Sequence, residues 1–275
     1  QLLPDINWGY SILKNGYIDI HNGQIHYSHI GEGDVALFLF HESPQSAKVY
    51  ANVMPHLSDN FSVYAFDTPG YGNSTPPNKP LKIEEYASIL VDAIDKLDIK
   101  KYATGGCHTG ASLALEVINL KGQDDAVFCV LNGVPYFSSE ERQEYMNNWS
   151  PDIEISQNGE HLIWAWERYK RIYGHEASKE LVNFGAVGIL ECLEKYNWAY
   201  NAAFEYVPDS LLKNLDVPIL FLNSKKDLLT HCDIEADKIT KNSTLSLHSD
   251  HPGQLHMREP KIYSSEIIKF YNSLS

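Results

Sequence analysis

The sequence predicts an α/β protein: a doubly wound, mostly parallel β-sheet with an inserted helical lid. Short apolar runs typical of strands alternate along the chain with segments of helical spacing, the order that parallel sheets require. The alternation stops after residue 135 and resumes near residue 215, which indicates an insertion. Unusual polar and glycine-rich sequences also follow the apolar runs, at the strand ends where such sheets bind ligands. These sequences are residues 41–46, 67–74, 107–110 and 132–135.

The N-terminal half supplies most of the predicted sheet. Asn22-Gly23 joins two short runs and is a strong signal for a hairpin turn. The continuous apolar run over 35–40 is expected of a strand buried on both faces. Apolar side chains recur at helical spacing over 83–97, which predicts a helix there. The other strands expected in this half are residues 61–66, a stretch beginning at Lys101, and residues 126–131.

Residues 135–214 differ from the rest because they are helical in pattern, rich in aromatic side chains and without a clear strand. Ser138 and Glu141 have the spacing of a capping box, which predicts a helix start. We expect this segment to form a lid, with some of its aromatic side chains facing a cleft. The domain prediction is a core of residues 1–134 and 215–275 and a lid of residues 135–214. The aromatic residues noted in the lid are Trp164, Trp166, Tyr169, Tyr173, Trp198, Tyr200, Phe204 and Tyr206.

The C-terminal residues return to the alternating pattern. Strands are expected over 217–223 and 244–248, and helices over 233–239 and 260–274. Pro260 fits the first turn of the last helix, because that position needs no backbone N–H. This part should therefore complete the sheet.

The composition argues against several classes of function. The 275 residues, 43% of them hydrophobic, suffice for one sizeable core with an inserted subdomain. The formal net charge of −14 makes nucleic acid and anionic membranes poor partners and favours a neutral or cationic small molecule. No signal peptide and no apolar run of about 18 residues is visible, so we expect a cytoplasmic protein. The four cysteines lie far apart, so neither a metal nor a cofactor is expected. A homodimer is left open.

The sequence from Gly106 to Gly110 has the spacing of a nucleophile elbow, a sharp turn from a strand into a helix. Two glycines flank His108. Glycine is expected at both positions because a Cβ atom there would clash in such a turn. The central position usually holds Ser, Asp or Cys. A register centred on Cys107 is the alternative, but it loses the second glycine, so we prefer His108.

A histidine at the elbow has different chemistry from a serine. A serine hydroxyl needs a base to ionise it, whereas a neutral imidazole is already a nucleophile or a general base for water. The N-terminus of the following helix disfavours a protonated ring. We therefore expect His108 to be mostly neutral at pH 7.

From Gly16 onward the chain resembles the α/β-hydrolase fold superfamily, in the lid-bearing branch of epoxide hydrolases, haloalkane dehalogenases and C–C bond hydrolases. Four ordered motifs carry the resemblance. They are His41-Glu42-Ser43-Pro44 for the His-Gly-x-Pro loop, residues 67–74 for the D-x-x-G-x-G-x-S loop, the elbow, and Asp227 for the acid that follows a strand. The chain also looks like a subgroup with His-Thr-Gly at the elbow and residues 158–162 as Asn-Gly-Glu-His-Leu in the lid.

The resemblance implies roles for several residues. The backbone N–H groups of Ser43 and Thr109 would form an oxyanion hole, typically worth about 3–4 kcal/mol per donor. Asp227 would orient an imidazole, or alternatively would bond loop amides. The family's C-terminal catalytic histidine falls on Gly253 or Gln254 here. His251 is the nearby candidate for that partner, and a solvated loop residue is its alternative.

We expect the remaining candidates at the substrate pocket, and several of them have a second interpretation. His41 supports the oxyanion loop by hydrogen bonding. Glu42 replaces a glycine and is either an acid/base group or a ligand for a cation. His161 either lines the pocket or caps a helix, and His256 either lines it or is a buried, hydrogen-bonded histidine. Cys107 and Trp164 complete this set.

Two functions compete on this evidence. The first is a cofactor-free hydrolase or related lyase acting on a small, largely apolar ester, thioester or C–C substrate, with His108, Asp227 and His251 as its catalytic residues. The second is an inactive hydrolase-fold protein that binds a small ligand or a partner. The changes at Glu42, His108 and Gly253 favour the second, and the retained elbow glycines, Pro44 and Asp227 favour the first.

Overall fold

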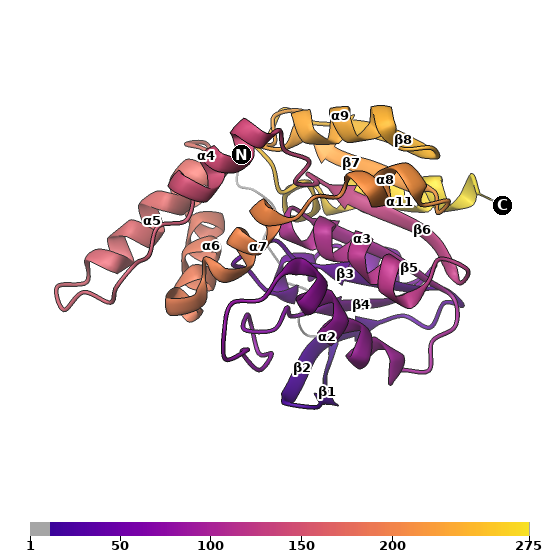
Figure 1. The fold of residues 1–275 in the computed structure, drawn as a ribbon, viewed down its shortest axis with the longest axis horizontal. Helices are drawn as coiled ribbons and strands as arrows, with labels where there is room; N and C mark the ends of the chain where they lie inside the picture. The colour runs from indigo at the N-terminus through magenta and orange to yellow at the C-terminus, as the bar shows by residue number, and fades with distance from the viewer. Residues whose placement is uncertain (1–11, 275) are drawn as a thin grey trace.

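The computed structural model describes residues 12–274, and the remainder of the predicted core, residues 1–11 and 275, lies outside the described residues. Within them one sheet has the strand order β1-β2-β4-β3-β5-β6-β7-β8 (Figure 1). β2 pairs antiparallel with β1 and β4, and the other neighbours are parallel. The strands are β1 (Lys14–Ile20), β2 (Gly23–Ile30), β3 (Ala36–Phe40), β4 (Ser62–Phe66), β5 (Tyr102–Cys107), β6 (Ala126–Asn132), β7 (Ile219–Ser224) and β8 (Ser243–His248).

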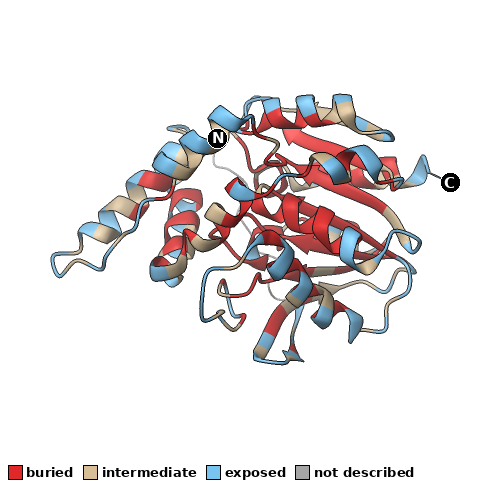
Figure 2. Ribbon diagram, viewed as in Figure 1, coloured by how far each residue is buried: buried red, intermediate tan, exposed pale blue. Residues whose placement is uncertain are grey.

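Helices cover both faces of the sheet, so its central strands are buried throughout (Figure 2). One apolar cluster joins the sheet to α2 (Ile83–Asp95), α3 (Thr109–Lys121) and α9 (Thr230–Ile239). The other cluster lies on the opposite face. It includes η2 (Ala47–Tyr50), α1 (Met54–Leu57), α10 (Leu255–Arg258) and α11 (Pro260–Asn272). This arrangement confirms the predicted doubly wound sheet.

The chain between β6 and β7 is helical and contains no strand, as expected. Ser138 caps the first of its helices: its hydroxyl accepts from the Glu141 N–H at 3.2 Å, and the Glu141 carboxylate accepts from the Ser138 N–H at 2.9 Å. Figure 1 shows α4, α5 and α6 beyond one end of the sheet. The elements are α4 (Ser139–Asn148), α5 (Glu160–Tyr173), α6 (Lys179–Glu191), η3 (Leu193–Lys195), α7 (Trp198–Glu205) and α8 (Asp209–Asn214).

The loop after β4 is held by the buried Asp67. Its Oδ1 accepts from the Ala47 N–H at 2.7 Å, and its Oδ2 accepts from the Asn73 N–H at 2.8 Å and lies 2.8 Å from His26 Nδ1. Burial raises the pKa of Asp67, but His26 and these N–H groups outweigh it and hold the pKa below its usual value. One carboxylate thus ties three segments together.

Asp67→Asn should lower the free energy of unfolding at neutral pH by about 1–3 kcal/mol, because a buried donor loses its acceptor. A carboxyl whose folded pKa is depressed stabilises the fold above its unfolded pKa, and this stabilisation is lost as the pH falls through the folded pKa. The difference between wild type and variant should therefore shrink in the acid range. Urea unfolding of wild type and Asp67→Asn, from neutral pH down to about pH 3, measures this difference in the free energy of unfolding. The exposed Asp59→Asn is the control, and an equal loss there would contradict the assignment.

Candidate active site

The elbow places His108 between the end of β5 and the start of α3. Its backbone has φ 49° and ψ −112°, a conformation that non-glycine residues rarely adopt. A Cβ atom on Gly106 would lie 2.0 Å from the Gly110 carbonyl oxygen, and one on Gly110 would lie 2.0 Å from that of Phe40. Both glycines are therefore needed for this turn, as the sequence predicted.

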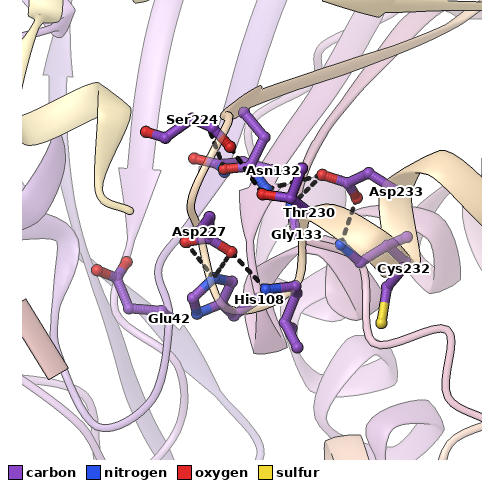
Figure 3. A network of polar contacts seen from close by, with 12 residues as sticks. Glu42, His108, Asn132, Gly133, Ser224, Asp227, Thr230, Cys232 and Asp233 are labelled. Atoms are coloured by element: carbon purple, nitrogen blue, oxygen red, sulfur yellow. Dashed lines mark hydrogen bonds and ion pairs between the residues drawn. The ribbon is translucent and has the colours of Figure 1, made fainter. Parts of the chain in front are cut away.

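His108 is paired with Asp227, which follows β7. His108 Nε2 lies 3.0 Å from Asp227 Oδ1 and 3.1 Å from Oδ2 (Figure 3). Asp227 Oδ1 also accepts from the Leu229 N–H at 2.8 Å. The acid thus reaches the elbow residue directly. With Nε2–H donated to the carboxylate, the neutral ring carries its lone pair on Nδ1, which has no hydrogen-bond partner among residues 12–274.

The expectation that His108 is mostly neutral is wrong. Burial lowers the pKa of His108, but the Asp227 carboxylate more than offsets burial and brings the pKa to about 9. For Asp227 the two effects have the opposite signs. Burial raises its pKa, but His108 and the Leu229 N–H outweigh burial and lower the pKa below its usual value. A full negative charge 3.0 Å away outweighs the partial charge of a helix N-terminus, which is about half an elementary charge.

A second carboxylate, Asp233 on α9, binds the ends of β6 and β7 together beside the pair. Asp233 Oδ2 accepts from the Gly133 N–H and from Asn223 Nδ2, each at 2.9 Å, and Oδ1 accepts from the Val134 N–H at 2.8 Å. Asn132 Nδ2 donates to Asn223 Oδ1, which links β6 to β7. Figure 3 shows this network beside the His108–Asp227 pair. The network holds the loop that carries Asp227.

His108 opens onto a cavity of about 310 Å³. Aromatic side chains from the β6–β7 segment make up much of its wall, and Glu42, Ser43, Thr109 and Asp227 form its floor near the elbow. The aromatic lining residues are Phe137, Tyr145, Trp149, Tyr169, Tyr173, Tyr200 and Phe204. The cavity is therefore mostly apolar, with polar and charged residues from several loops in its wall.

Ser43 and Thr109, the residues expected to supply the oxyanion donors, both line the cavity, and that role stays a prediction. The backbone N–H of Thr109 is at the first position of α3 and so has no acceptor within the helix. Within the described part of the chain, neither this N–H nor that of Ser43 is hydrogen-bonded. Both donors are consequently free to bind an acceptor in the cavity.

The assignment of His251 as a catalytic partner is wrong. Its side chain is 46% exposed, and its Nε2 lies 3.1 Å from Glu259 Oε1, away from the cavity. The resemblance puts the family's histidine at Gly253 or Gln254, and both residues have a positive φ here, 125° and 53°. Gly253 lies against Asp227. A Cβ atom there would lie 2.4 Å from Asp227 Oδ2. Any side chain at this position would have to displace the carboxylate that binds His108.

Five other residues assigned to the pocket do not line this cavity. His41 is buried and supports the loop, because its Nδ1 lies 2.9 Å from the Glu42 carbonyl oxygen and its Nε2 accepts from the Thr68 N–H. His161, in the first turn of α5, accepts from the Ser156 N–H through Nδ1 and so holds the segment before the helix; it does not cap the helix, whose N-cap, Gly159, has no side-chain cap. Trp164 packs on Tyr196 and on the Arg168 guanidinium.

Cys107 and His256 are both fully buried. The second interpretation of His256 holds only in part, because neither of its ring nitrogens has a hydrogen-bond partner. Glu42 does reach the cavity, as predicted.

Several site residues were missed by sequence reasoning. Asp233 gave no signal, because an acidic residue inside a helix looks like a solvated one. Gln254 lines the cavity in a left-handed conformation (φ 53°) that the sequence does not indicate. Arg171 and Lys226 also line it, and both are exposed at the surface. The aromatic richness of the β6–β7 segment was the one available signal for its walls.

Comparison with known proteins agrees with this geometry. A model of the alpha/beta hydrolase fold family matches residues 35–152. Human serine hydrolase BPHL is 24% identical over 266 residues, which cover 93% of this chain and 85% of the human protein. Haloalkane dehalogenase 2 of Mycobacterium bovis is 29% identical over 106 residues, 38% of this chain and only 37% of the dehalogenase.

Solved structures show the same fold over almost the whole chain. A thermophilic esterase from Thermogutta terrifontis has a TM-score of 0.77 at 18% identity and covers 95% of this chain and 99% of its own. Epoxide hydrolase CorEH has a TM-score of 0.76 at 16% identity, with 96% and 100% covered. In the part of the chain that the structure describes, no helix has the length and apolar composition needed to cross a membrane.

Replacing Asp233 should destabilise the hydrogen-bond network that holds the ends of β6 and β7. Asp233→Asn removes one of three acceptor contacts, so a buried donor is left unpaired and the free energy of unfolding should fall by about 1–3 kcal/mol. Chemical denaturation measures this. Glu235→Gln, on the exposed face of the same helix, is the matched control and should change stability little. Equal effects in the two variants would show that the network does not hold the site.

Proposed function

We propose that this chain, which has the α/β-hydrolase fold and is similar to hydrolases, hydrolyses a small, largely apolar ester, thioester or C–C substrate by means of His108. The observation that carries the proposal is the direct pairing of His108 Nε2 with Asp227, which leaves Nδ1 unpartnered in a ring that lines the cavity. The C–C substrate class follows a relative from Pseudomonas, a 2-hydroxy-6-oxononadienedioate/2-hydroxy-6-oxononatrienedioate hydrolase, that is 29% identical over 100 residues.

The proposed reaction uses three groups of the chain. The substrate carbonyl oxygen accepts hydrogen bonds from the N–H groups of Ser43 and Thr109, which stabilise the negative charge that develops on it. The ring must be unprotonated to act, so with a pKa of about 9 only the neutral fraction of His108 reacts near pH 7, and this fraction grows as the pH rises. Nδ1 of the neutral ring either attacks the carbonyl carbon or takes a proton from a water molecule that attacks it. The bond from the carbonyl carbon to the leaving group then breaks; the leaving group takes the proton held by the ring in the second route, or a proton from water in the first, after which water hydrolyses the acyl-imidazole. Asp227 holds the ring in the tautomer that carries the lone pair on Nδ1 and stabilises the positive charge that the ring acquires.

We further propose that the β6–β7 segment is the lid predicted for residues 135–214. Its aromatic side chains form the cavity wall that faces the elbow, so they would bind the apolar part of the substrate and exclude water from the reacting groups. The cavity of about 310 Å³ is at the small end of ligand pockets, which supports a compact substrate. A cytoplasmic location and a homodimer stay predictions from the sequence.

His108→Gln should lower kcat/KM at least about 100-fold, because glutamine keeps an N–H donor for Asp227 but has no basic nitrogen. The measurement is turnover of a panel of acyl esters of graded chain length, with thioesters and a vinylogous diketone added. The matched control is His251→Gln, which changes an exposed histidine that contacts Glu259 and should retain wild-type turnover. Equal turnover in wild type and His108→Gln would refute the proposal. Binding without turnover in wild type would instead support the inactive ligand-binding protein.

The two roles of His108 are separable by a second experiment. If Nδ1 attacks the carbonyl, acid quenching during turnover should trap an acyl group on the peptide that contains His108, and mass spectrometry detects it. If His108 activates water, the same peptide should stay unmodified at equal turnover. Cys107 lies in the same peptide, so fragmentation must place the group on the ring. An acyl group on Cys107 would contradict both roles.

A further inference from the structure

A second group of reactive side chains lies next to the elbow and is not used by the proposed reaction. It consists of Glu42 after β3, Cys107 at the end of β5 and His256 in α10. Their donor atoms all lie within 4.8 Å of one another, and His256 Nε2 is 3.6 Å from Glu42 Oε2. Figure 3 shows Glu42 beside His108. Three segments far apart in the sequence thus bring a carboxylate, a thiol and an imidazole to one point.

These groups are buried without the partners that buried polar groups normally have. Glu42 is 5% exposed, and Cys107 and His256 are 0% exposed. Neither carboxylate oxygen of Glu42 and neither ring nitrogen of His256 has a hydrogen-bond partner among the described residues. Glu42 Oε2 and His256 Nε2 form an ion pair at 3.6 Å when the ring is protonated, but this separation is too long for a hydrogen bond. Buried polar side chains are almost always hydrogen-bonded, and buried charges are paired or coordinate a metal.

We propose that Glu42, Cys107 and His256 bind a divalent transition-metal ion of the zinc type. Thiolate, imidazole and carboxylate together are ligands that zinc accepts, whereas magnesium and calcium prefer oxygen alone. Zinc bonds of about 2.0–2.3 Å place tetrahedral ligand atoms about 3.3–3.8 Å apart, and the His256–Glu42 separation already falls in that range. A dication also balances the two negative charges of a thiolate and a carboxylate in this buried place.

The site borders the cavity. Glu42 lines the cavity that His108 opens onto, while its two carboxylate oxygens are themselves buried and face the thiol and the imidazole. Three protein ligands leave a fourth position for water, which is the ligand count of catalytic zinc sites rather than of structural ones. The metal ligands are different residues from the His108–Asp227 pair, so metal binding and turnover are tested separately.

The test is cobalt substitution. The purified full chain, kept reduced, is treated with a chelator and titrated with Co²⁺, and the absorption spectrum is recorded together with the metal content. Wild type should bind one Co²⁺ per chain and show a thiolate-to-cobalt charge-transfer band, which requires a cysteine ligand. Cys107→Ser should abolish that band. His256→Gln should weaken metal binding at least about 10- to 100-fold, because the loss of a residue that only supports a metal ligand already costs that much.

Matched controls separate this site from adventitious binding. Cys129→Ser changes another fully buried cysteine, and His251→Gln changes an exposed histidine, so both should keep the band and the stoichiometry. Circular dichroism of each variant checks that it is folded, and Zn²⁺ should raise the melting temperature of wild type and of both controls but not of Cys107→Ser. Absence of the band in wild type, or its persistence in Cys107→Ser, would overturn the proposal and leave a buried carboxylate–imidazole pair.

Discussion

The contact between His108 and Asp227 is the constraint on which the site depends. It joins the elbow after β5 to the loop after β7, across the carboxyl end of β6, which lies between these two strands, at 3.0 Å. Burial disfavours the ionised form of this carboxylate. It stays ionised because the His108 ring and the Leu229 N–H both bind it. In return it fixes the ring, raises its basicity and leaves Nδ1 as the nitrogen available to a ligand. The rest of the site follows from this pairing.

The fold fixes the residues around that contact in one conformation. Gly106 and Gly110 allow the tight turn, and the start of α3 leaves the Thr109 N–H without an acceptor. Asp233 and Asn223 hold the ends of β6 and β7 together, which keeps the Asp227 loop in place. Gly253 removes the side chain that would otherwise collide with Asp227. A side chain at position 253 and the Asp227 carboxylate bound to His108 therefore compete for the same space.

Much of this could be predicted from local sequence patterns. The hairpin at Asn22-Gly23, the capping box at Ser138 and the elbow glycines each depend on residues close together in the chain, and each is confirmed. The failures concern partners that are distant in sequence. The charge of His108 is set by Asp227, 119 residues further on, which no local argument about the helix dipole includes. His251 was assigned by counting residues, but the direction of its side chain depends on the backbone of the loop.

The buried group at Glu42, Cys107 and His256 escaped sequence reasoning for a similar reason. Zinc sites are recognised in sequence by closely spaced ligands, whereas these three come from separate elements. Glu42 was noticed only because it replaces a glycine of the oxyanion loop. The structure shows what the glutamate adds at this position: a carboxylate close to the His256 imidazole and the Cys107 thiol, on a residue that also lines the cavity.

The most direct test of the account is a crystal structure of the His108→Ala variant with an uncleaved ester or thioester bound. The account predicts the carbonyl oxygen about 2.7–3.1 Å from the backbone N–H groups of Ser43 and Thr109, with the carbonyl carbon facing the vacated imidazole position and the apolar group among the aromatic side chains of the cavity. A ligand bound in the cavity with its carbonyl turned away from these N–H groups, or bound elsewhere on the molecule, would contradict it.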